Sequence, residues 1–189
     1  MIFVFLNMFS IAWWALSYKY SLEKGCHPFG VIVALAGTAV AVSLSWRLGH
    51  GGQLAPPLFL LFLGVSSGAC LSLAVVAYFY LIQSGARLGV SWTVVTLSMS
   101  IPTAASIFVW KELPAPHHWP ALLCAVAGIC LLGRVKPGGG RMTAHESMLL
   151  AAAFLFSGLA AVVNKMFAAS AFDAHKDLYL AMTFMTAFV

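Results

Sequence analysis

Hydroxyl side chains recur along one stretch of the chain at the spacing of a helix face. Thr93, Thr96, Ser100 and Thr103 stand at positions i, i+3, i+7 and i+10, with Pro102 beside them. Residues at this spacing share one face of an α-helix. The stripe can bind a polar solute, and Pro102 can free a backbone carbonyl or let the helix bend. The same hydroxyls can instead bond to carbonyls of their own helix.

Two lysines are the charges that lie closest to the interior of long apolar segments. Lys19 follows Tyr18, and Lys165 follows Asn164. A buried ammonium can pair with an anionic solute or with an internal counter-ion. A lysine near a helix end can instead extend its charge into the lipid headgroups. Both roles stay open for Lys19 and Lys165.

Large aromatic residues gather near the ends of the apolar segments. A belt of Trp and Tyr at the lipid headgroups is typical of membrane helices. Trp14, Tyr78 and Trp92 can alternatively line a cavity for an aromatic or amphipathic solute. Together with the hydroxyl stripe and the two lysines they complete the predicted solute-binding set, which is Trp14, Lys19, Tyr78, Trp92, Thr93, Thr96, Ser100, Pro102, Thr103 and Lys165.

Enzyme and metal motifs are weak in this chain. The stretch 64–68 reads G-x-S-x-G, and its two glycines also form the GxxxG pattern that lets membrane helices approach closely. A rhomboid-type protease would need a histidine at the depth of Ser66, but all six histidines lie in predicted connections. Adjacent His117 and His118 have no further ligand at a recognised spacing. We predict no enzyme activity, no metal and no cofactor.

The elements that must position these residues are membrane helices. The chain is 62% hydrophobic and 8% charged. Its long charge-free runs are 1–18, 25–46, 58–86, 88–110, 113–133 and 147–164. A hydrocarbon core about 30 Å thick takes about 20 helical residues to cross, and unbroken apolar runs lack the alternation of barrel strands. We predict an all-α polytopic membrane protein.

The expected order is five helices, a linker, and the start of a second helical unit. They lie at 3–22, 29–47, 58–83, 88–110, 118–134 and 147–169, and a partial seventh begins near 178. The Pro-Gly-Gly-Gly run at 137–140 predicts a boundary, so that 1–135 is one unit, 136–146 a linker and 147–189 an incomplete second unit. Residues 14–19 and 160–165 match weakly, as in a repeat. The short last helix predicts a truncated sequence.

The basic residues indicate lipid rather than nucleic acid as a partner. The net charge is +5, but Lys and Arg stand singly at helix ends, where they anchor to headgroups. Six of them flank the odd-numbered connections and four the even-numbered ones, a bias that favours an extracytoplasmic N-terminus.

Residues 77–133 carry a series of short motifs in a fixed order. They are Ala77-Tyr78-Phe79-Tyr80-Leu81, Ser98-Met99-Ser100-Ile101-Pro102, Trp110-Lys111-Glu112-Leu113-Pro114, Trp119-Pro120-Ala121 and Gly128-Ile129-Cys130-Leu131-Leu132-Gly133. In order and spacing this series resembles the end of the five-helix unit of EamA-type transporters, which belong to the drug/metabolite transporter superfamily. Glu112 matches the acidic residue that follows the fourth helix in that family.

The resemblance implies a fold and a function. Members of that family typically have ten helices in two five-helix repeats of opposite topology and move small metabolites or drugs by alternating access. By analogy, 1–135 is the first repeat, and the missing part of the second comes from further sequence or from a second copy in a homodimer. We therefore expect a solute transporter in the cytoplasmic (inner) membrane of a bacterium. The alternatives are a non-transporting subunit, a partner-dependent half-transporter and, more remotely, an intramembrane protease.

Overall fold

All regular elements in the described part of the chain are helices. The computed structural model describes residues 23–50, 56–84, 88–112, 143–170 and 175–187, together with residues 5, 9, 13, 16, 17, 20, 21, 115, 119, 120, 123, 124, 127, 128 and 172. The helices are α2 (Pro28–Gly49), α3 (Leu58–Gln83), α4 (Leu88–Leu97), α5 (Ser100–Phe108), α7 (Ala144–Ala168) and α8 (Lys176–Thr186). The predicted all-α class is confirmed. The helices expected at 3–22 and 118–134 and the glycine run at 137–140 lie mostly or wholly outside the described residues.

Three of the described helices are long and apolar enough to cross a membrane. They span Phe29–Gly49, Leu58–Gln83 and Ala144–Ala168. The shortest has 21 residues, which corresponds to about 31 Å of helix. Side chains such as Val42 and Phe62 remain exposed on their surfaces. Lipid tails solvate such side chains at no cost, so these helices suit a membrane protein.

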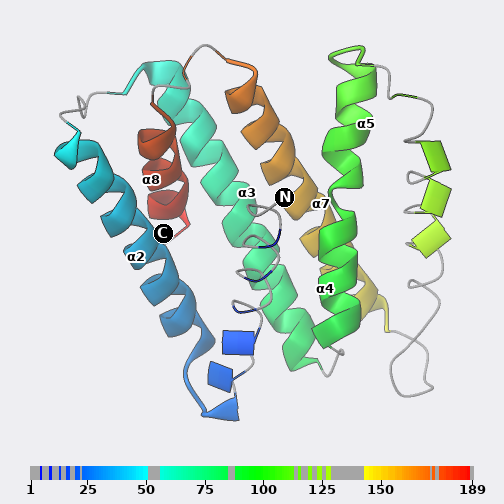
Figure 1. Ribbon diagram of the computed structural model, residues 1–189. Coiled ribbons are helices and arrows are strands. Elements are labelled where there is room, and N and C mark those ends of the chain that lie inside the picture. The colour runs from blue at the N-terminus through cyan, green and yellow to red at the C-terminus, as the bar shows by residue number, and fades with distance from the viewer. Residues whose placement is uncertain are drawn as a thin grey trace.

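Helices α3 and α7 pack against each other in the middle of the described bundle (Figure 1). Helix α7 also packs against α4 and α5, while α8 packs against α2 and α3. Near the start of α3, Leu63 lies in one core cluster with Phe167 and Tyr179, whose rings stack at 4.1 Å between centroids. Near the end of α3, Ala77 lies in a second cluster with Ala153. Helices α3 and α7 are therefore antiparallel.

The helix directions gather several helix ends on one side of the bundle. Helices α2, α5 and α7 finish where α3 and α8 begin, at the top of Figure 1. An ion pair between Arg47 and Asp177 joins the end of α2 to the start of α8 at this side. We call it the Lys165 end, because Lys165 lies in the last turn of α7.

The helix predicted at 88–110 is two helices, and this prediction was wrong. Helices α4 and α5 are separated at residues 98–99. Pro102 has no amide hydrogen, and its ring crowds the carbonyl four residues earlier, which is that of Ser98. That carbonyl instead accepts a hydrogen bond from the Ile101 amide, only three residues on, at 2.9 Å. Pro102 thus explains the interruption.

Helix α7 begins before the predicted start at 147. The Thr143 hydroxyl accepts a hydrogen bond from the Glu146 amide at 3.2 Å, and the Glu146 carboxylate accepts one from the Thr143 amide at 2.8 Å. This reciprocal pair is a capping box, which satisfies amides that have no partner within the helix. His145 therefore lies in the first turn of α7 and not in a connection.

Candidate functional site

Two adjacent polar side chains near the end of α7 organise the candidate site. Asn164 and Lys165 lie about 100° apart around the helix axis, because successive residues of an α-helix are rotated by that angle. They therefore reach different neighbours. Lys165 contacts residues at the end of α5, and Asn164 contacts α3 and α8.

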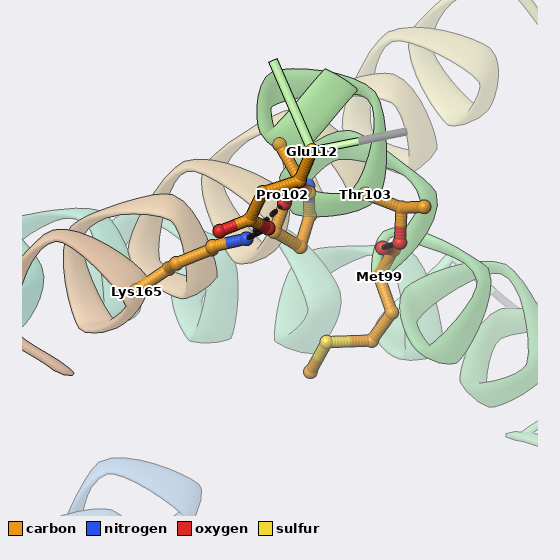
Figure 2. A network of polar contacts seen from close by, with 6 residues as sticks. Met99, Pro102, Thr103, Glu112 and Lys165 are labelled. Carbon is orange, nitrogen blue, oxygen red and sulfur yellow. Dashed lines mark hydrogen bonds and ion pairs between the residues drawn. The ribbon is translucent and has the colours of Figure 1, made fainter. Parts of the chain in front are cut away.

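The first group of contacts surrounds the Lys165 ammonium (Figure 2). Its Nζ donates hydrogen bonds to the Ser106 hydroxyl and to the Glu112 carboxylate, with which it also forms an ion pair. It lies 5.2 Å from the centre of the Trp110 ring. A carboxylate, a hydroxyl and an indole face each stabilise a cation. We call Ser106, Trp110, Glu112 and Lys165 the Lys165 cluster.

The two charges of this cluster differ in their exposure. The Lys165 side chain is 28% exposed, and that of Glu112 is 58% exposed. Ion pairs as exposed as this contribute about 0–1 kcal/mol, because solvent screens them. The pair therefore tethers α5 to α7 weakly.

The chain turn after α5 carries Glu112 back toward α7. Lys111 has a φ of 55°, in the left-handed region that few non-glycine residues adopt. The Glu112 amide then donates to the Ser106 carbonyl at 3.1 Å. These two features bring Glu112 beside Ser106, so that both reach Lys165.

Ser106 also connects the lysine to the segment that begins with the helix break. Its hydroxyl donates to the Pro102 carbonyl at 2.7 Å, so its oxygen is free to accept from Lys165. Figure 2 shows this series of contacts running from α7 to the first turn of α5. The position of the ammonium is thereby linked to the segment at which α4 and α5 separate.

The second group of contacts joins three helices through one amide. The Asn164 side-chain oxygen accepts hydrogen bonds from the Ser67 hydroxyl at 3.0 Å and from the Tyr179 hydroxyl at 2.5 Å. Ser67 is on α3 and Tyr179 on α8, so the amide ties both to α7. We call these three residues the Asn164 cluster. Such hydrogen bonds between membrane helices stabilise their association modestly.

We expect Tyr179→Phe to lower the free energy of unfolding by about 1 kcal/mol, because it removes one hydrogen bond and keeps the ring that stacks on Phe167. Unfolding by SDS titration in mixed micelles measures the change. Tyr80→Phe is the control, since Tyr80 is 48% exposed, and it should change the value by less than about 0.5 kcal/mol. Equal losses in the two variants would contradict the role given to the Tyr179 hydroxyl.

The sequence-predicted site residues are only partly brought together. Trp14 and Lys19 lie outside the described residues, as does the Trp92 side chain. Tyr78 is 6% exposed and packs with Ala77 and Ala153 between helices. A part for these residues in binding a solute stays a prediction from the sequence.

The hydroxyl stripe is divided by the break between α4 and α5. Thr96 donates to the Thr93 carbonyl at 2.8 Å, and Thr103 donates to the Met99 carbonyl at 2.9 Å. Thr93 and Thr96 are exposed, while Ser100, Pro102 and Thr103 are half-buried. Of the predicted set, Pro102 and Lys165 are the two that the Lys165 cluster connects, through Ser106.

Sequence reasoning did not select Ser106 or Trp110. Ser106 follows Thr103 by three positions, a spacing that extends the stripe toward Lys165.

Within the described ranges the most enclosed hydroxyls of α4 and its end are Ser91 and Ser98, at 1% and 0% exposure. The Ser66 hydroxyl donates to the Phe62 carbonyl of its own helix at 2.6 Å.

Comparisons of the chain with protein-family models, with curated proteins and with solved structures found no match. The likeness to EamA-type transporters therefore depends on the motif order in 77–133. The functional argument depends on the geometry of the two clusters.

Proposed function

We propose that this protein is a multi-pass membrane transporter that moves a small solute by alternating access. The observation that carries the proposal is the Lys165 cluster. A lysine in the last turn of a membrane-length helix is held by a hydroxyl, an indole and a carboxylate, next to a helix interrupted by proline. Ionisable residues in membrane helices commonly mark solute or ion pathways.

The Lys165 cluster lies where it can couple solute binding to a movement of α5. The series from Lys165 through Ser106 to the Pro102 carbonyl joins α7 to the first turn of α5. A solute that changes the contacts of Lys165 therefore acts on α5. The interruption at residues 98–99 gives α5 a point about which to pivot.

The order of motifs in 77–133 supports an EamA-type architecture. In that architecture the chain has six complete spans and part of a seventh, with 1–135 as the first repeat and 147–189 as the start of the second. The membrane is the cytoplasmic membrane of a bacterium, and the partners are lipid and a small solute.

Transport is tested by reconstituting the full chain in liposomes and measuring counterflow of labelled small carboxylates, amines and neutral amphipathic compounds. We expect Lys165→Gln to lower the initial rate by about tenfold, because a charge-assisted contact is lost. Lys176→Gln is the matched control, since it removes an exposed lysine at the same end of the bundle and should leave the rate unchanged.

Two outcomes would contradict the proposal. One is a wild-type protein that moves no member of the panel faster than empty liposomes. The other is an equal loss of rate in Lys165→Gln and Lys176→Gln, which would show a general effect of surface charge.

A further inference from the structure

We propose that the Lys165 cluster binds a solute carrying one carboxylate, and that Glu112 competes with this solute as an internal carboxylate. The inference deepens the proposed function and rests on it, because it names the class of solute and the step that starts its movement. Its basis is the arrangement of Ser106, Trp110 and Glu112 around one ammonium.

The Glu112 carboxylate shows which chemical group the cluster accepts. One of its oxygens accepts a hydrogen bond from Lys165 Nζ, while Ser106 accepts another. The cluster has a single cation, so a singly charged carboxylate balances it and a doubly charged phosphate does not. The Trp110 ring beside the ammonium offers an apolar face to the body of the solute. An amphipathic monocarboxylate meets these conditions.

The exposure of Glu112 and Lys165 indicates which of the two moves away when a solute binds. Glu112 is the more exposed of the two and lies in a turn beyond the end of α5. Water solvates its carboxylate as soon as it moves away. Lys165 is more enclosed and keeps Ser106 and Trp110 when Glu112 departs. A solute carboxylate can therefore take the place of Glu112 while the ammonium stays paired.

This exchange removes the ion pair that ties the segment after α5 to α7 at the Lys165 end, while the hydrogen bond from Lys165 to Ser106 stays. Glu112 lies in the turn beyond Phe108, the last residue of α5, so its contact with Lys165 ties this turn to α7. Nearer the break, Gly158 of α7 admits the side chain of Ile101, because a Cβ at Gly158 would lie 2.7 Å from the Ile101 Cβ. This close contact between Gly158 and Ile101 stays in place when the ion pair of Glu112 and Lys165 is broken. The solute thus removes one of the two polar contacts that join α7 to this end of α5 and its following turn, and it leaves the Ile101 end packed.

Binding of radiolabelled benzoate to the purified full chain in phosphatidylcholine nanodiscs tests the inference. Benzamide, which has the same shape without the charge, is the matched probe. We expect benzoate and not benzamide to bind the wild type. Glu112→Gln should bind benzoate about fivefold more tightly, because the solute no longer has to displace an exposed ion pair. Lys165→Gln should lose benzoate binding.

A charge exchange separates ligand binding from stability. The double variant Lys165→Glu/Glu112→Lys can rebuild an ion pair between α5 and α7, and we expect it to unfold like the wild type. It should fail to bind benzoate with wild-type affinity, because the cation now lies on the exposed turn. Lys176→Gln should bind benzoate as the wild type does.

Three results would overturn the inference. The first is equal affinity of benzoate for the wild type and Glu112→Gln, including the case in which neither binds. The second is binding of benzamide as strong as that of benzoate. The third is complete loss of benzoate binding when a minor fraction of phosphatidylserine is added, which would assign the site to the lipid carboxylate.

The test distinguishes this inference from the proposed function. Transport of a solute from the panel that is unaffected by Lys165→Gln would leave a transporter whose substrate does not use this site. Binding of benzoate with the expected response to Glu112→Gln, but with no solute moved in liposomes, would leave the anion site in place and remove the transport function.

Discussion

Gly68→Ala is expected to lower the free energy of unfolding by about 3 kcal/mol, because α3 and α8 touch at this position. A Cβ at Gly68 would lie 2.4 Å from the Thr183 carbonyl oxygen and 2.7 Å from the Thr186 Cβ. The carbonyl belongs to the backbone of α8, so it cannot turn aside as a long side chain can. The added methyl must therefore push the two helices apart, with loss of contacts along their length.

An SDS titration of the full chain in mixed micelles measures this loss. The matched control is Gly30→Ala in α2, where nothing lies within 4 Å of the added Cβ. That variant should be neutral or more stable by up to about 1 kcal/mol, because alanine favours the helix. Equal stabilities of the two variants would show that α3 and α8 do not approach closely in the membrane protein.

The role of Gly68 was partly predictable from the sequence. The spacing of Gly64 and Gly68 predicted a close helix approach, and the contacts of both glycines confirm it. The sequence could not identify the partner helix. Gly64 meets Met182, more than a hundred positions away, and nothing in the local pattern indicates such a pairing.

Helix existence was predictable from composition, while helix ends depended on local chemistry. Long apolar runs predicted α2, α3 and α7 within a few residues of their observed bounds. The early start of α7 follows from the Thr143 and Glu146 capping box, a signal that the sequence contained. The break in 88–110 follows from Pro102, a residue visible in the sequence, which cannot donate an amide hydrogen to the Ser98 carbonyl.

The candidate site was predictable in its central residue and not in its surroundings. Lys165 stood out because a charge near the interior of an apolar segment needs a partner. Its partners lie 59 and 53 positions earlier, at Ser106 and Glu112, and tertiary packing alone brings them to it. Glu112 stood out in the sequence only as the acidic residue of the motif series in 77–133. The motif order did not indicate its ion pair to Lys165.

Asp177→Asn is expected to lower the free energy of unfolding by about 3 kcal/mol, because it removes a counter-charge from an enclosed arginine. Arg47 is 7% exposed, and its guanidinium lies 3.7 Å from the Asp177 carboxylate. Arg47 is in the last turn of α2 and Asp177 in the first turn of α8, so each helix dipole favours the charge at its end. The pair thereby joins α2 to the rest of the bundle.

A double-mutant cycle in the same SDS titration separates the pair from its two members. The cycle consists of Arg47→Met, Asp177→Leu and the double variant Arg47→Met/Asp177→Leu, which replaces both charges with apolar side chains. We expect the double variant to recover most of the stability that Asp177→Leu alone loses. Lys176→Gln, which alters an exposed neighbour, should change the value by less than about 0.5 kcal/mol. If the double variant lost as much as the sum of its single variants, the two side chains would be acting separately. The join between α2 and α8 would then depend on apolar packing and not on the ion pair.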